Sequence, residues 1–144
     1  MIYFDTSYLA KCYLNETGSA AVRRIAQSQS TVACCEYGRI EVMSTFHRNL
    51  RDGMLAKSQF DTVARQFKSD DESGVWIWLP LTADLCRKTA ARIKALPAST
   101  FVRAGDALHL TAAAENGFAE IYSNDRHLRA AAALFGLEAV NVIR

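Results

Sequence analysis

Two apolar runs of the sequence end in an acidic residue, and at both places a carboxylate could do chemistry. Residues 2–4 lead into Asp5 in the stretch "IYFDTS", and residues 121–122 lead into Asp125 in the stretch "EIYSND". Short apolar runs of this kind are typical of buried strands. Because ligands bind at the carboxyl ends of the strands in a parallel α/β sheet, Asp5 and Asp125 are candidates for one shared site.

Two further acids lie in segments that we expect to be helical. Glu41 lies inside "YGRIEVMSTF", and Asp106 stands at the head of "GDALHLTAAA". Arg103 comes just before Asp106 and could hold it in an ion pair. The neighbours of Glu41 at helical spacing are mostly small, so another group could approach it closely; they are Tyr37, Gly38, Ser44 and Thr45.

If these four acids converge, the chemistry of the cluster follows from repulsion. Two carboxylates about 5 Å apart repel by about 3 kcal/mol at an effective dielectric constant of about 20. Several such pairs raise some of the pKa values or demand a bound cation. Carboxylate oxygens suit Mg²⁺ or Mn²⁺ rather than zinc, and such an ion can activate water and stabilise charge on a phosphoryl group.

Each acid also has a simpler structural explanation. Asp5 and Asp125 can cap the helices that follow them. Glu41 can be a solvent-facing helical residue, and Asp106 can interact favourably with the dipole at its helix start. His109 lies one turn after Asp106 on the same helix face, and we interpret it as a structural residue rather than a catalyst.

Strands and helices are expected to alternate along the whole chain. Hydrophobic periodicity and turn residues predict strands at residues 2–4, 31–35, 75–79, 120–123 and 138–143. They predict helices at residues 6–14, 18–29, 36–50, 57–68, 82–97, 106–116 and 125–136. This pattern favours a parallel, helix-covered sheet in one α/β domain, residues 1–144.

Composition excludes several classes of protein. The chain has 144 residues, is 50% hydrophobic and 22% charged, and has a formal net charge of +2. These values are typical of a globular domain. The net charge is too small for the molecule as a whole to attract nucleic acid, so any basic surface has to be a local patch. No run approaches the ~20 apolar residues that span a bilayer, and no signal peptide is expected, so the predicted location is the cytoplasm.

The cysteines and histidines show no metal-ligand or disulfide pattern. No two cysteines form a C-x-x-C pair, and the histidines are far apart in the sequence. We therefore interpret the cysteines as small core residues of a reduced protein. They are Cys12, Cys34, Cys35 and Cys86.

Taken together, four motifs resemble those of the PIN-domain ribonucleases, in particular the VapC-type toxins of bacterial type II toxin–antitoxin systems. The motifs are "IYFDTS", "RIEVMSTF", "RAGDALHLTAA" and "YSND". Their order and spacing extend the resemblance over essentially the whole chain. It implies a three-layer α/β/α sandwich with a mainly parallel, five-stranded sheet, and a hydrolase that cleaves RNA phosphodiester bonds with Mg²⁺, for which Mn²⁺ can substitute.

The resemblance also implies roles for individual residues. Metal binding and catalysis would fall to Asp5, Glu41, Asp106 and Asp125, with Asp125 supporting a second metal or orienting the attacking water. Contacts to the phosphate or to metal-bound water would come from Thr6, Ser7 and Ser123; threonine is commoner than serine at the last of these positions. Glu36 replaces the family's usual serine or threonine and could be an extra acid at the rim.

The expected partners are RNA, a cognate antitoxin and a second copy of the chain. Candidates for RNA contact are Arg39, Arg48, Arg51, Arg103 and Arg126, although each could equally be a solvated helix residue. The resemblance implies a homodimer inhibited by a small antitoxin that inserts a segment near the acids. The expected helical hairpin around "HRNLRDGML" is a candidate surface for a partner or an ordinary exposed corner.

Two other functions remain open from the sequence alone. A haloacid-dehalogenase-like phosphatase also ends its first strand in an aspartate, but it needs a second aspartate two residues later, where this chain has Ser7. A non-catalytic α/β module that binds RNA or protein is the other alternative. The effect of Mn²⁺ on heat stability distinguishes this module from the nuclease. A metal that binds a native site stabilises the fold, so a nuclease should be stabilised and a non-catalytic module should not.

Overall fold

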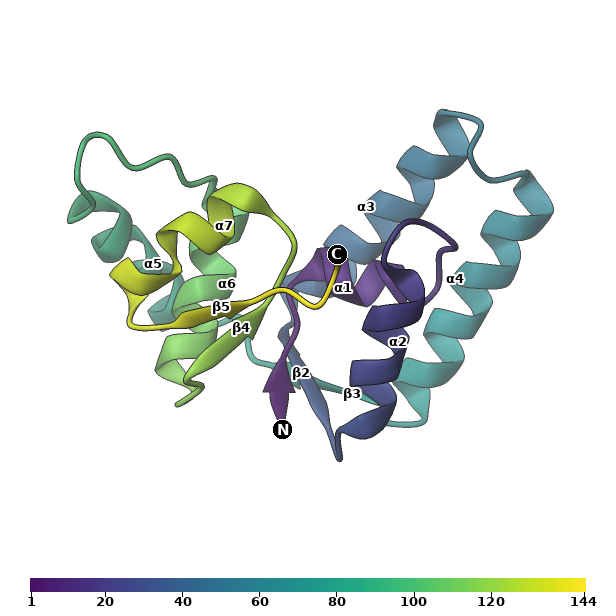
Figure 1. The fold of residues 1–144 in the computed structure, drawn as a ribbon, viewed down its shortest axis with the longest axis horizontal. Coiled ribbons are helices and arrows are strands. Elements are labelled where there is room, and N and C mark those ends of the chain that lie inside the picture. Colours follow the sequence, from purple (N-terminus) through teal and green to yellow (C-terminus); the bar gives the residue numbers. More distant parts are fainter.

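The computed structural model describes residues 1–144 and confirms an α/β fold with parallel strands (Figure 1). The strands are β1 (Ile2–Tyr3), β2 (Val32–Cys35), β3 (Trp76–Leu79), β4 (Glu120–Tyr122) and β5 (Glu138–Val140). The helices are α1 (Thr6–Lys11), α2 (Ser19–Ser28), α3 (Tyr37–Arg51), α4 (Lys57–Glu72), α5 (Ala83–Lys94), α6 (Ala104–Glu115) and α7 (Arg126–Ala131), which continues as the 3-10 helix η1 (Ala132–Phe135).

The strands form two parallel sheets rather than the single five-stranded sheet that we expected. One sheet has the order β1-β2-β3, and the other pairs β4 with β5. A single parallel bridge between Phe4 and Tyr122 joins them, supported by a hydrogen bond from the backbone N–H of Asp5 to the carbonyl of Tyr122. Pairing stops there because the chain turns into α1 directly after Asp5.

Strand β1 lies between two hydrophobic cores because successive side chains of a strand point to opposite faces. Ile2 and Phe4 belong to one core, which includes residues of α1, α2, α3 and α4. Tyr3 belongs to the other core, which includes residues of α5, α6 and α7. The two groups of helices flank β1 in Figure 1, so helices cover both faces of the central strand. Burying each large apolar side chain contributes about 1.5–3 kcal/mol.

Helix α4 is longer than the sequence pattern indicates. We expected the polar stretch "KSDDESG" to end the helix near Lys68, but α4 continues to Glu72. Its last turn is stabilised by distant partners: the Tyr13 hydroxyl donates to Asp70 at 2.6 Å, and the Trp78 indole N–H donates to Asp71 at 2.7 Å. Tertiary contacts therefore override the local polarity here.

The remaining elements follow the expected order with small shifts at their ends. Helix α1 stops at Lys11 instead of residue 14, and the Lys11 ammonium contacts Glu16 and the carbonyl of Thr17 in the loop that follows. All four cysteines are free, and Cys34 and Cys35 are buried as expected. Cys86 is exposed, so its interpretation as a core residue was wrong.

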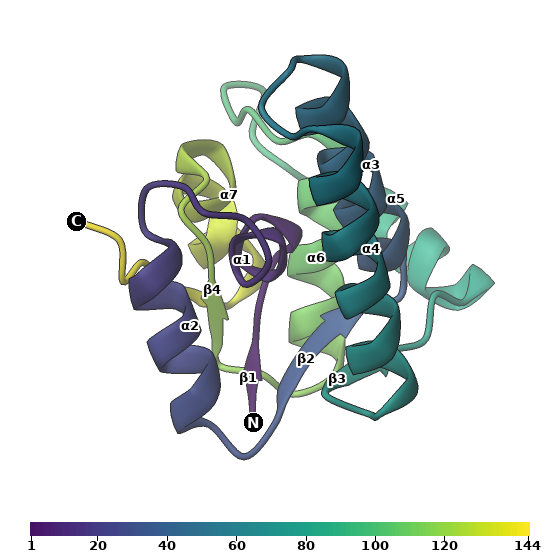
Figure 2. The same cartoon turned by 90° about the vertical axis from the view of Figure 1, so that its right-hand side faces the viewer.

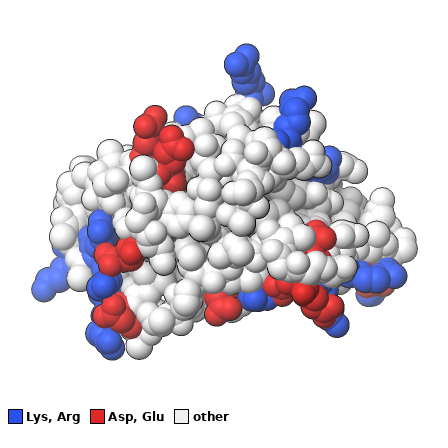
Figure 3. All heavy atoms as spheres, turned by 90° about the horizontal axis from the view of Figure 1, so that it is seen from below, with Lys and Arg blue, Asp and Glu red and all other residues white.

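The starts of several helices gather at the carboxyl end of β1. Figure 2 shows α1 directly above β1, with α7 on one side and α3 and α6 on the other. The opposite face, at the amino end of β1, is uncharged across most of its middle, with acidic and basic side chains dispersed near its edges (Figure 3). None of the helices is long and apolar enough to span a membrane.

Candidate functional site

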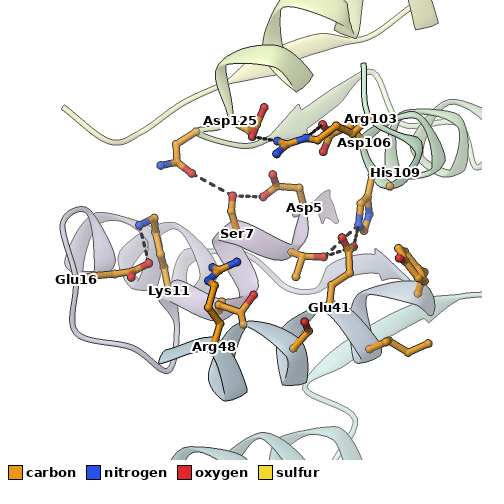
Figure 4. Close-up of a pocket in the computed structure, with 18 residues that line it drawn as sticks. Asp5, Ser7, Lys11, Glu16, Glu41, Arg48, Arg103, Asp106, His109 and Asp125 are labelled. Carbon is orange, nitrogen blue, oxygen red and sulfur yellow. Dashed lines mark hydrogen bonds and ion pairs between the residues drawn. The ribbon is translucent and has the colours of Figure 1, made fainter. Parts of the chain in front are cut away.

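A cavity of about 640 Å³ opens at the carboxyl end of β1 and contains all four predicted acids. Asp5 follows β1, Glu41 lies on α3, Asp106 on the first turn of α6, and Asp125 directly before α7. Figure 4 shows these side chains directed toward the same space from four segments that are distant in the sequence. Three cationic side chains also line the cavity, namely Lys11, Arg48 and Arg103.

Asp5 is the most buried of the four acids, with only 4% of its surface exposed. It caps α1, as the structural explanation predicted, because its Oδ1 accepts the backbone N–H of Tyr8 at 3.0 Å. It also accepts hydrogen bonds from Ser7 at Oδ1 and from Ser123 at Oδ2. Burial raises the pKa of Asp5, and the hydrogen bonds from the two serines oppose that rise.

Glu41 is oriented by a buried histidine rather than by solvent. Its Oε1 lies 2.5 Å from His109 Nε2 and accepts the Thr6 hydroxyl at 2.8 Å. Burial raises the pKa of Glu41, but the contacts with His109 and Thr6 outweigh it and leave the pKa below its usual value. Glu41 is therefore ionised at neutral pH, and its Oε2 has no hydrogen-bond partner in the protein.

His109 links Glu41 to strand β1. Its Nδ1 lies 2.7 Å from the hydroxyl of Tyr3, which in turn accepts the backbone N–H of Cys35 at 3.0 Å. Burial lowers the pKa of His109, but its neighbours, including Glu41, raise it well above the usual value. The interpretation of His109 as a structural residue fits this position, since the ring bridges the core to the site acid.

Asp106 and Asp125 share one cation, the guanidinium of Arg103. Arg103 Nε lies 3.1 Å from Asp106 Oδ2, and Arg103 Nη2 lies 2.5 Å from Asp125 Oδ2. The predicted Arg103–Asp106 pair is thus present, and Asp125 is a second partner. Burial raises the pKa of Asp106, and Arg103 opposes the rise while the nearby Asp125 adds to it.

The chemistry of these side chains fits a hard divalent cation. All four acids present oxygen to the cavity, and carboxylates are the ligands that Mg²⁺ and Mn²⁺ prefer. In their present arrangement, however, no three Asp, Glu, His or Cys side chains are placed so that together they could hold an ion. The donors are therefore of the right type, and side-chain movement is needed to bring them together.

Comparison with known proteins decides the family. The PIN domain profile matches residues 2–134 of the chain. The chain belongs to the PIN-domain family. No curated protein sequence matches it at a significant level.

The fold of this PIN domain is also similar to that of a solved toxin structure. That protein is VapC20 of Mycobacterium tuberculosis, described as a sarcin–ricin loop cleaving toxin. The match has a TM-score of 0.72 at 18% sequence identity and covers 91% of this chain and 95% of VapC20. At this identity, the match shows that the two chains share a fold.

The three predicted hydroxyl residues of the PIN domain orient the acids in this structure. Thr6 donates to Glu41, and both Ser7 and Ser123 donate to Asp5. Ser123 also accepts the backbone N–H of Asp125, so it links the two strand-end acids.

The predicted RNA-contact arginines separate into two groups. Arg48 and Arg103 line the cavity of the PIN domain, whereas the other three lie outside it. Arg39 pairs with Asp71 and stacks on Trp78, and Arg51 pairs with the adjacent aspartate at the end of α3. Arg126 is exposed at the start of α7.

Glu36 is not an extra acid of the cavity. It is the residue preceding α3, where its carboxylate lies 3.6 Å from Arg39. Neither its side chain nor that of Arg39 lines the cavity.

Lys11, Glu16 and Gly105 are among the cavity residues that were missed in the sequence. Lys11 and Glu16 form a 2.8 Å ion pair at the edge opposite Arg103 (Figure 4), and Lys11 is only 8% exposed. Gly105 allows α6 to approach α3, because a Cβ there would lie 3.2 Å from Glu41 Oε2. The glycine in "RAGD", directly before the predicted helix at 106–116, was a usable signal for such a close approach. The Lys11–Glu16 spacing carried no such signal.

Proposed function

We propose that this PIN domain is a metal-dependent endoribonuclease and the toxin of a toxin–antitoxin pair. The observation that carries the proposal is the convergence of Asp5, Glu41, Asp106 and Asp125, from four distant segments, on one cavity. Helix capping accounts for Asp5 and Asp125 but gives no reason for Glu41 and Asp106 to face them. The shared fold with VapC20, a toxin described as cleaving an RNA loop, supports the RNA substrate and the toxin role.

In the proposed mechanism, Asp5, Glu41 and Asp106 would hold the divalent ion directly or through water, and Asp125 would support a second ion or orient the attacking water. When bound, such an ion lowers the pKa of water and stabilises negative charge on the phosphate. The residues around the acids hold them in place: Ser7 and Ser123 fix Asp5, while Thr6 and His109 fix Glu41. Lys11, Arg48 and Arg103 supply positive charge for the RNA backbone along the same cavity.

Regulation is part of the proposal. A small antitoxin protein would inhibit the enzyme by inserting a segment near the acids, and two copies of the chain would form the active dimer. Co-purification of the chain with a short protein encoded beside it tests the antitoxin. The molar mass of the purified chain in solution tests the dimer.

Cleavage of RNA by purified protein tests the proposal. We expect cleavage with Mg²⁺ or Mn²⁺, none in EDTA, and a loss of at least about 100-fold in Asp5→Asn and Asp106→Asn. Asp61→Asn is the matched control, because Asp61 is exposed on α4, where it pairs with Lys57 outside the cavity. Circular dichroism shows whether each variant is folded. A folded Asp5→Asn protein with full activity would contradict the mechanism.

Thermal unfolding separates the nuclease from a binding module. A native metal site stabilises the folded chain as the metal concentration rises. A rise in melting temperature with millimolar Mn²⁺ is expected. Its absence would favour a non-catalytic domain that binds RNA or protein.

A further inference from the structure

Arg103 occupies the position of a counter-ion between two of the four acids. It is the residue before α6, and its guanidinium bridges Asp106 and Asp125 across the mouth of the cavity (Figure 4). The two acids are mostly shielded, with side-chain exposures of 17% and 27%, whereas the Arg103 side chain is 58% exposed. The cation thus lies on the solvent side of the acids that it joins.

The oxygen that Arg103 binds on Asp125 is the one that remains available for the cavity. Asp125 Oδ1 accepts the backbone N–H groups of His127 and Leu128, both at 2.9 Å, and caps α7 in this way. Only Oδ2 is left, and Arg103 Nη2 lies 2.5 Å from it. Any other cation that binds Asp125 without uncapping α7 therefore competes with this guanidinium nitrogen for Oδ2.

We propose that Arg103 is a built-in competitor for divalent metal, holding Asp106 and Asp125 until a metal ion displaces it. The inference rests on the proposed function, since it concerns how the same acids take up the metal. It explains why donors of the right chemistry line one cavity without being arranged to hold an ion. On displacement, the exposed guanidinium remains at the mouth of the cavity, where the phosphate backbone of RNA would pass.

The strength of the Arg103 contacts is suited to displacement. Ion pairs at an exposed surface stabilise proteins weakly, because solvent screens them and long side chains lose entropy. The neighbourhood of Arg103 is also exposed: Phe101 is 58% exposed and contacts His127 of α7, with ring centroids 4.2 Å apart. Arg103 can therefore leave the acids without disturbing a buried core.

Calorimetric titration with Mn²⁺ tests the proposal without relying on activity. Arg103→Gln keeps a polar side chain but removes the cation, and we expect it to bind Mn²⁺ about three- to tenfold more tightly than the wild type. Arg103→Lys keeps the charge but cannot reach both carboxylates with a planar fork, so an intermediate affinity is expected. Arg48→Gln is the matched control, because Arg48 lines the same cavity but forms no ion pair with the acids.

The melting temperature of the metal-free protein gives a second readout. Arg103→Gln should lower it, since Asp106 and Asp125 lose their counter-ion, while Mn²⁺ should raise it by more than in the wild type. A purely structural role for Arg103 would lower the melting temperature without tightening Mn²⁺ binding, and that result would overturn the proposal. Equal tightening in Arg103→Gln and Arg48→Gln would also overturn it, since that pattern reports only general repulsion.

The outcomes distinguish this proposal from the proposed function. If the wild type cleaves RNA with metal but Arg103→Gln binds Mn²⁺ no more tightly than the wild type, the proposal that Arg103 competes with metal is overturned. The proposed nuclease function is then still supported. If no variant binds Mn²⁺ and no RNA is cleaved, both proposals are overturned.

Discussion

Asp5 is a buried helix cap and, in the proposed function, also a charged metal ligand, and these two roles conflict energetically. Its three hydrogen-bond donors favour the carboxylate, but burial disfavours charge and raises its pKa. The metal-free site is therefore destabilising at neutral pH. A cation would relieve this cost, which is the usual compromise of a functional site between stability and activity.

Replacing Asp5 by asparagine should therefore stabilise the metal-free protein while abolishing its response to metal. The amide keeps the size of the side chain and removes the buried charge, so we expect a gain of about 1 kcal/mol, or about 4 °C in melting temperature. Mn²⁺ should then raise the melting temperature of Asp5→Asn much less than it raises that of the wild type. Thermal unfolding with and without Mn²⁺ measures both effects, and a clear loss of metal-free stability would contradict this view of Asp5.

The same shift gives a pH dependence with a definite sign. An acid whose pKa is higher in the folded state than in the unfolded state binds more protons when folded, so its contribution to stability falls as pH rises. The stability of the wild type relative to Asp5→Asn should thus decrease as pH rises from the ordinary aspartate pKa of 3.8 through the raised folded value. Unfolding of both proteins in urea between pH 4 and pH 8 tests this; a difference that grows with pH would contradict the raised pKa.

At the scale of elements, Tyr3 connects strand β1 to the helix that carries Asp106. Its hydroxyl accepts the Cys35 N–H and lies 2.7 Å from the ring of His109, which reaches Glu41. Tyr3→Phe leaves the buried N–H without a partner and His109 Nδ1 with only the distant Sγ of Cys34, at a cost of about 2 kcal/mol. Tyr122→Phe is the control, since that hydroxyl makes only a 3.3 Å contact with Glu120 and should cost little. If chemical denaturation shows that Tyr3→Phe and Tyr122→Phe lose equal free energies of unfolding, the proposed importance of the Tyr3–His109–Glu41 hydrogen bonds is contradicted.

Close packing of α3 on β2 fixes the position of Glu41. Gly38 lies on α3 where an added Cβ would come 2.6 Å from the Sγ of Cys34. Gly38→Ala should cost about 1–3 kcal/mol through overpacking. In the double variant with Cys34→Ala the sulfur is gone, so the loss should be smaller than the sum of the single losses. Additive losses in urea unfolding would show that the contact with Cys34 is not the cause.

At the scale of the whole molecule, the net charge of +2 leaves RNA binding to local cations. Arg48 lines the cavity without an acidic partner, so Arg48→Gln should weaken RNA binding and reduce the magnitude of the salt-dependence slope by about 0.7–1. Arg39→Gln should leave the slope unchanged, because Arg39 is paired with Asp71 outside the cavity. Binding measured in EDTA, which prevents metal-dependent cleavage, tests both; equal slopes for the three proteins would contradict the assignment.

Much of the fold could be predicted from the sequence because its signals are local. The strand-end acids of "IYFDTS" and "YSND", the apolar periodicity and the turn residues are all readable within a few positions. The length of α4 could not be predicted, because Asp70 and Asp71 depend on Tyr13 and Trp78. The division into two sheets could not be predicted either, because it depends on how Phe4 pairs with Tyr122, a residue distant in the sequence.

The candidate site shows the same division. The four acids and the Arg103–Asp106 pair were identifiable, but two more distant pairs were not: Glu41 and His109 are 68 positions apart, and Arg103 and Asp125 are 22 apart. Glu36 and Arg39 were chosen because they are close to a motif in the sequence, yet neither of them lines the cavity. The sequence therefore predicts which types of side chain supply oxygen atoms to the site, while the direction in which each side chain points depends on tertiary packing.

The central claim is that the acids of this PIN domain form one divalent-metal site, and diffraction from crystals soaked in Mn²⁺ tests it most directly. We expect an anomalous peak among Asp5, Glu41 and Asp106, with the guanidinium of Arg103 withdrawn from Asp125. An ordered, fully soaked crystal with no anomalous peak in this cavity would contradict the claim.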